Sequence, residues 1–142
     1  MTYALGAASI ANLRGVHIDL VRVVTLAITL TKVDFKVIEG VRTPERQRAL
    51  YAQGRTAPGP VVTWTLNSNH FRQRDGFGHA VDLLPAPYDW KATAPFDEVA
   101  RAMRLASEVL GIPIRWGKDW DGDGRVGEKG ESDSPHFELA AR

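Results

Sequence analysis

The residues best able to do chemistry in this chain are its four histidines and some of its 17 acidic residues. There is no cysteine, so any metal ion must be held by imidazole or carboxylate groups. A catalytic zinc ion commonly takes three such ligands and keeps a fourth position for water. His17 stands alone at the start of a predicted helix, with only Asp19 nearby, which is typical of a structural histidine. His70, His79 and His136 remain as candidate ligands.

Asp82 is the best candidate ligand among the acids. It lies in an apolar run, residues 80–84, that predicts a β-strand. In such a strand Val81 and Leu83 point to one face, towards a core, and Asp82 points to the other. A carboxylate in this position is costly to bury unless a cation lies beside it.

The segment 135–139 alternates polar and apolar residues and predicts the last strand of the chain. His136 and Glu138 would share one face, which either lines a site or is the exposed side of an edge strand. Asp133 lies three residues before His136, where a carboxylate can act as general base towards a metal-bound water. An aspartate in a polar loop is otherwise simply solvated.

The elements that must position these residues follow from periodicity and from helix start and stop signals. An amphipathic helix is predicted over 17–31 and another over 96–110. A third helix begins with Thr43 as N-cap and ends at Gly54, so that Arg42 precedes it and Gln47 lies in its first turns. The other segments are strands at 35–38, 61–66 and 112–116, and a polar loop at 119–134. Helices and short strands without a regular βαβ alternation indicate an α+β fold.

Length and charge narrow the function classes further. The 142 residues predict a single domain, 1–142, large enough for one hydrophobic core. A formal net charge of +1 gives no strong field for a phosphate backbone, so nucleic acid is not an expected partner. The first fifteen residues lack the features of a signal peptide, and no apolar run is long enough for stable membrane insertion.

A second metal site is conceivable in the polar loop. Asp119, Asp121 and Asp123, followed by Gly124, match the first half of an EF-hand calcium loop. The second half fails, because the twelfth position is Gly130 and Glu131 comes one residue late. A calcium site with altered closure and a plain acidic loop both remain open.

Several of these segments together resemble the zinc peptidases that cut D-amino-acid-containing bonds in peptidoglycan. The group comprises D-alanyl-D-alanine carboxypeptidases and dipeptidases and L-alanyl-D-glutamate endopeptidases, and the chain looks most like the phage endolysin branch. The resemblance rests on motifs spread over nearly the whole chain: residues 15–24, 39–47, Ser68-x-His70, Gly78-x-Ala80-x-Asp82, 115–117, Asp133-x-x-His136 and 135–139.

The resemblance implies a short antiparallel sheet flanked by helices, with a zinc site in a cleft on the sheet. It implies zinc held by His70, Asp82 and His136, and Asp133 as general base. Arg42 matches an arginine that would stabilise the oxyanion or clamp a substrate carboxylate. Gln47 and Ser68 match positions that contact substrate.

The spacing of the first two implied ligands departs from the family pattern. His70 and Asp82 are twelve residues apart rather than seven, with an apparent insertion at residues 71–76. We interpret this as a longer loop between the same two ligands. His79 is the rival ligand, but on a strand it would point to the face opposite Asp82.

The resulting hypothesis is a zinc metallopeptidase, most simply an L-alanyl-D-glutamate endopeptidase that acts as a phage or prophage endolysin. Within the class the alternative is a D-alanyl-D-alanine carboxypeptidase. From another class comes a non-catalytic wall-binding or calcium-binding module. An endolysin would be a monomer that stays in the host bacterial cytoplasm until a separate holin-like protein releases it to the peptidoglycan.

Overall fold

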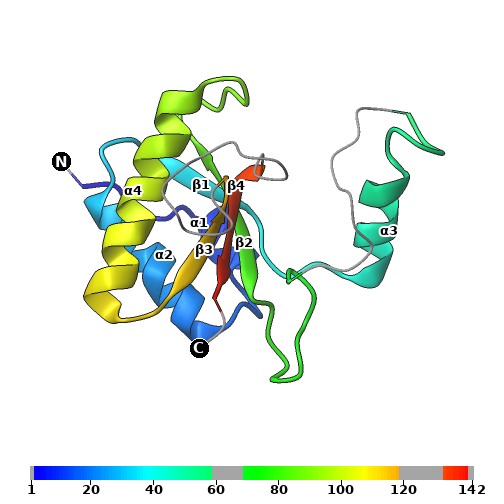
Figure 1. Cartoon of the computed structure of the whole chain (residues 1–142), viewed down its shortest axis with the longest axis horizontal. Coiled ribbons are helices and arrows are strands. Elements are labelled where there is room, and N and C mark those ends of the chain that lie inside the picture. Colours follow the sequence, from blue (N-terminus) through cyan, green and yellow to red (C-terminus); the bar gives the residue numbers. More distant parts are fainter. Residues whose placement is uncertain (1, 59–68, 119–132, 141–142) are drawn as a thin grey trace.

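The computed structural model describes residues 2–58, 69–118 and 133–140. In these ranges the chain forms a small antiparallel sheet with helices packed around it (Figure 1). The elements are α1 (Ala7–Asn12), α2 (Ile18–Leu30), β1 (Phe35–Glu39), α3 (Pro44–Ala52), β2 (Ala80–Pro85), α4 (Thr93–Leu110), β3 (Ile114–Gly117) and β4 (Asp133–Leu139). This confirms the α+β class that the sequence predicted.

The sheet has four strands in the order β1-β2-β4-β3, and each neighbouring pair is antiparallel. Alternation along the strands gives the sheet two different faces. Val81, Leu83 and Phe137 lie in the hydrophobic core. Asp82 and His136, each adjacent in sequence to a core residue, therefore point to the opposite face.

Helices α2 and α4 pack against each other and cover the core face of the sheet (Figure 1). The five apolar residues that give α2 its predicted stripe are all buried: Leu20, Val23, Val24, Ala27 and Ile28. Helix α4 contributes Val99, Met103 and Ala106 and ends at Gly111 in the left-handed conformation (φ 67°). The amphipathic patterns thus identified both helices and the faces that they bury.

Helix α1, which the sequence did not predict, covers the outer edge of the sheet. The backbone N–H of Val37 donates to Ser9 Oγ (3.0 Å), and Asn12 Nδ2 donates to the carbonyl of Val37 (2.8 Å). Strand β1 is an edge strand, and these bonds occupy polar backbone groups that would otherwise be open to another chain. Helix α1 has only six residues, too few for a helical period of apolar residues to be recognised in the sequence.

Other boundaries differ from the predictions by a few residues. Helix α4 begins at Thr93 instead of Phe96, and β3 begins at Ile114 instead of Ile112. Asp133 and Ser134, expected in a loop, are the first residues of β4 because they continue its pairing with β3. The predicted strand at 61–66 lies outside the described residues. No helix in the described part of the chain has the length and apolarity needed to cross a bilayer.

Candidate metal centre

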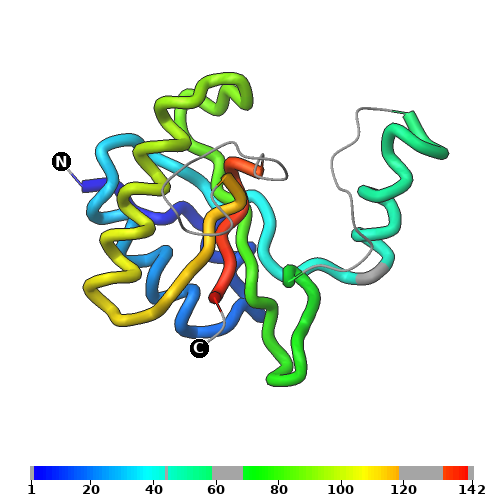
Figure 2. Tube along the Cα trace, in the orientation of Figure 1, coloured from blue at the N-terminus to red at the C-terminus, as the bar shows by residue number. Residues whose placement is uncertain are grey.

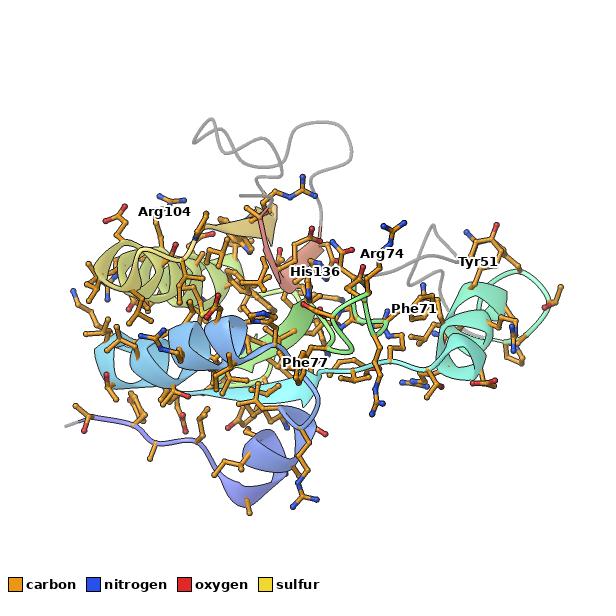
Figure 3. All side chains as sticks on the ribbon, turned by 90° about the horizontal axis from the view of Figure 1, so that it is seen from below. Tyr51, Phe71, Arg74, Phe77, Arg104 and His136 are labelled. Atoms are coloured by element: carbon orange, nitrogen blue, oxygen red, sulfur yellow. The ribbon has the colours of Figure 1, made fainter. Side chains whose placement is uncertain are left out.

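The sheet brings two of the predicted ligands directly opposite each other. Asp82 in β2 and His136 in β4 are register partners, so their side chains leave the same face of the sheet at neighbouring positions. His70 reaches them from the loop before β2. Figure 2 traces the chain from β1 out to α3, and Figure 3 shows His136 with α2 and α4 on one side and α3 on the other.

The three side chains converge on one point. His70 Nε2 lies 3.3 Å from His136 Nδ1 and 3.3 Å from Asp82 Oδ1. His136 Nδ1 lies 3.4 Å from the same Asp82 oxygen. Each residue offers one ligand atom, and the three atoms lie within 4.8 Å of one another. Within the described residues, this is the group of histidine and acidic side chains whose spacing fits a metal ion.

Hydrogen bonds on the outer side of each ring decide which nitrogen faces this point. His70 Nδ1 lies 2.8 Å from the carbonyl oxygen of Gly40, which can only accept a hydrogen bond. His136 Nε2 lies 2.8 Å from the carboxylate of Glu138, which accepts as well. The proton of each neutral ring is therefore on the outer nitrogen, and the inner nitrogen has a lone pair for a metal.

The carboxylate of Asp82 supports the same conclusion. Its Oδ1 is buried and has no hydrogen-bond partner of good geometry among the described residues. A buried polar atom without a partner is costly, and a cation at this point would satisfy it. Two imidazole nitrogens and one carboxylate oxygen form a donor set suited to a divalent transition metal, with zinc among the candidates.

Charges around the cluster hold Asp82 ionised. Burial opposes ionisation, but the rings of His136 and His70 outweigh it and keep the pKa of the Asp82 carboxyl well below its usual range. Burial also lowers the pKa of His136, yet Asp82 and Glu138 together raise it to about 9. In the metal-free protein at neutral pH, a proton therefore occupies the position that a metal would take.

Glu138 anchors His136, a contact that the sequence did not reveal. It is 6% exposed, and its second oxygen accepts from Asn69 Nδ2 (2.6 Å) and Arg115 Nη2 (3.1 Å). Burial raises the pKa of Glu138, but His136, Arg115 and Asn69 reverse this and lower it. A pocket of about 550 Å3 opens beside Asn69, Arg115 and Glu138. The sequence signal for this contact was the alternation of the last strand, which puts His136 and Glu138 on the same face.

Arg42 connects Asp82 to the start of α3. Its Nη2 lies 3.4 Å from Asp82 Oδ2, its Nη1 donates to Gln47 Oε1 (2.6 Å), and its Nε donates to Glu39 Oε1 (3.1 Å). Thr43 caps α3 as predicted, which fixes Gln47 in the first turns of that helix. Gln47 is fully buried. The planar guanidinium thus holds one Asp82 oxygen and leaves the other to face the two histidines.

Asp133 lies at the rim of the cluster, at the start of β4. Its Oδ2 is 3.8 Å from His136 Nδ1, and its side chain is 53% exposed. Partial removal from water and the negative charge of Asp82 raise the pKa of Asp133. Asp133 of β4 pairs with Gly117 of β3. A side chain at position 117 would collide with the backbone of Asp133, so glycine is needed there. Asp133 therefore lies next to the cluster of His70, Asp82 and His136, and its side chain remains accessible to solvent.

The remaining candidate residues lie apart from the cluster or outside the described ranges. His79 points away from the cluster and contacts Asp75 (Nε2 to Oδ2, 2.7 Å). His17 caps α2, where its Nδ1 accepts from the backbone of Asp19 (3.0 Å), as expected for a structural histidine. Ser68, Asp119, Asp121 and Asp123 fall outside the described residues.

Comparisons with known proteins agree with this geometry. Residues 1–140 match the family described as phage L-alanyl-D-glutamate peptidase. The L-alanyl-D-glutamate peptidase of Escherichia phage T5 is 28% identical over 145 residues, covering 98% of this chain and 99% of that protein. The crystal structure of the Serratia marcescens L-Ala D-Glu endopeptidase ChiX matches with a TM-score of 0.72 and 36% identity, over 94% of this chain and 87% of that one. The chain therefore belongs to the phage L-alanyl-D-glutamate peptidase family.

Proposed function

We propose that this protein is a zinc-dependent peptidoglycan endopeptidase that hydrolyses the L-alanyl-D-glutamate bond of the stem peptide. The observation that carries the proposal is the convergence of His70 Nε2, Asp82 Oδ1 and His136 Nδ1, with both ring tautomers set by outer hydrogen bonds. Membership of the peptidase family supports the substrate class.

Zinc at this point would polarise the scissile carbonyl and lower the pKa of a nearby water molecule towards neutrality. Asp133 accepts the proton of the attacking water at Oδ2 and passes it to the nitrogen of the leaving D-glutamate as the peptide C–N bond breaks. Its raised pKa makes the Asp133 carboxylate a stronger base towards the attacking water. Arg42 holds Asp82 in place and supplies a positive charge beside the negative charge that develops on the carbonyl oxygen.

The biological role that we propose is that of a phage or prophage endolysin. The protein acts as a monomer, remains in the cytoplasm of the host bacterium and reaches the wall when a holin-like protein opens the membrane. Peptidoglycan is the partner that the family supports. Calcium binding by Asp119, Asp121 and Asp123 remains a separate proposal, tested by calcium titration with each aspartate changed to alanine.

A digest of purified muropeptides, analysed by mass spectrometry, tests the reaction. We expect cleavage between L-alanine and D-glutamate with zinc supplied, and none after chelation. Release of terminal D-alanine would instead identify a carboxypeptidase. Asp133→Asn should keep the zinc content and lose the product. Binding to sacculi without product from the zinc-loaded protein would indicate a non-catalytic wall-binding module and would refute the proposal.

A further inference from the structure

The segment that separates the first two metal-cluster residues is an ordered hairpin, residues 71–77. The backbone N–H of Gln73 donates to the carbonyl of Phe77 (2.8 Å), and that of Gly76 donates to the carbonyl of Gln73 (2.9 Å). Arg72 and Gly78 form an antiparallel bridge at its base. We call this segment the 71–77 hairpin.

The base of the hairpin is tied to the metal cluster and to α2. The carbonyl of His70 accepts from the backbone of Arg42 (2.8 Å), and the backbone of His79 donates to the carbonyl of Asn69 (2.7 Å). Gly78 exchanges backbone hydrogen bonds with residues on either side of Val16, donating to Gly15 (2.9 Å) and accepting from His17 (2.9 Å). The hairpin therefore has a fixed position relative to His70.

The hairpin presents two cations that the described part of the chain does not neutralise. Arg72 and Arg74 are exposed, and neither forms an ion pair with a described residue. Asp75, the acid of the hairpin, is occupied elsewhere. It accepts from the backbone of Phe77 (3.0 Å), contacts His79 (2.7 Å) and lies 3.7 Å from His17.

These arginines are within reach of a substrate bound at the metal cluster. Arg74 is four residues from His70, so their Cα atoms are at most about 14 Å apart, which is close to the extended length of a four-residue peptide. In Figure 3, Arg74 and Phe71 lie between His136 and Tyr51 of α3, while Arg104 of α4 lies on the opposite side of the molecule. A stem peptide could therefore touch the metal cluster and the hairpin together.

We infer that Arg72 and Arg74 bind free carboxylates of the peptidoglycan stem peptide and thereby hold it across the metal cluster. This inference rests on the proposed function. A D-glutamate residue linked through its side chain keeps a free α-carboxylate, and the planar fork of arginine matches a carboxylate with two parallel hydrogen bonds. The hairpin is then a specificity element of the enzyme.

Steady-state kinetics of the double variant Arg72→Ala/Arg74→Ala test the inference, with Arg104→Ala as the matched control. Arg104 is also exposed and forms no ion pair with a described residue. On a soluble muropeptide with free carboxylates, we expect KM to rise roughly five- to twentyfold in the double variant, with kcat within about twofold. On the same muropeptide with its carboxylates amidated, the double variant and the control should have equal KM.

Co-sedimentation with sacculi gives a readout that needs no catalysis. With the metal chelated, the wild-type protein should pellet with sacculi at low salt and be released as salt is raised, and the double variant should pellet less. Sacculi stripped of their anionic secondary polymers distinguish the two sources of negative charge. If the wild type still pellets more than the double variant on stripped sacculi, the arginines bind the peptide carboxylates. If the two proteins pellet equally on stripped sacculi, the inference is overturned.

Two kinetic results would also overturn it: equal KM for the double variant and Arg104→Ala on the free-carboxylate substrate, or an equal rise in KM on both substrates. Failure of the proposed function appears differently, because the wild-type protein would then release no muropeptide fragment. The sedimentation difference between the wild type and the double variant would still report on the hairpin in that case.

Discussion

His136 Nε2 and Glu138 Oε1 lie 2.8 Å apart on the same face of β4, and both residues are almost completely buried. This contact fixes the ring so that Nδ1 faces Asp82 and His70. Asn69 and Arg115 in turn fix Glu138. A carboxylate behind a metal-binding histidine orients the ring and increases its basicity.

Replacing Glu138 with glutamine should therefore weaken metal binding without removing a ligand. The side-chain amide keeps an oxygen for the His136 proton but loses the charge that supports the ring. We expect zinc affinity to fall about 10- to 100-fold, measured by competition with a chelator. Glu108→Gln, on the exposed side of α4, is the control and should bind zinc normally. Unchanged affinity in Glu138→Gln would show that the contact is structural only.

Zinc binding should release a proton near neutral pH. The pKa of His136 in the metal-free protein is raised to about 9, so its Nδ1 is protonated at pH 7, and a metal must displace that proton. Zinc affinity should therefore rise about tenfold per pH unit between about pH 7 and 8. Calorimetry in buffers of different ionisation enthalpy measures the released proton. Heats that do not depend on the buffer would contradict the prediction.

Loss of the proton from the His136 ring should also make the metal-free protein less stable in alkaline solution than at neutral pH. A folded-state pKa raised from 6.5 to about 9 adds stability that is fully present below pH 6.5 and is lost as pH rises through 9. The Tm of the metal-free protein should therefore decline over this interval. The zinc-loaded protein, whose His136 holds no exchangeable proton at Nδ1, should show a smaller decline. A flat profile for the metal-free protein would count against the charged state of His136.

Arg42→Lys tests whether the guanidinium fork, rather than its charge alone, is needed. A lysine cannot bond Asp82, Gln47 and Glu39 in one planar arrangement. We expect kcat/KM to drop by at least about tenfold and the free energy of unfolding by about 1–2 kcal/mol. Arg48→Lys, on the exposed surface of α3, provides the control. Full activity in Arg42→Lys would reduce the role of Arg42 to that of a nearby charge.

Sequence patterns predicted much of the fold because the relevant signals are local. The apolar stripe of α2, the Thr43 cap of α3 and the Gly111 stop of α4 each lie within a few residues of the element that they define. The convergence of His70, Asp82 and His136 depends instead on the pairing of β2 with β4, which periodicity alone does not encode. The motif resemblance, not the spacing, selected these three residues together.

The residues that orient the two histidines, Glu138 and Gly40, were harder to predict, because the hydrogen bonds that define their roles depend on the tertiary fold. Glu138 looked like one polar residue of an alternating strand, and its partner Asn69 is 69 residues away. Gly40 acts through a backbone carbonyl, for which no side chain gives a signal. Helix α1 was missed because its six residues are held by Val37 of β1 rather than by an apolar face of their own.

Gly40→Ala should disturb both the fold and the metal cluster. A Cβ at Gly40 would run into the backbone carbonyl of Asn12, which belongs to α1 and cannot swing away as a side chain can. Gly40 does not have a positive φ, so crowding is the reason for glycine here. We expect a loss of about 1–3 kcal/mol in the free energy of unfolding. Zinc affinity should fall too, because the displaced Gly40 carbonyl holds His70 Nδ1. Gly6→Ala meets open space around the new methyl group and loses only the N-cap preference for glycine, so it should cost at most about 1 kcal/mol and leave zinc affinity unchanged. Denaturant unfolding and a zinc titration of both variants measure these effects, and equal behaviour of the two would show that α1 yields to the added methyl group.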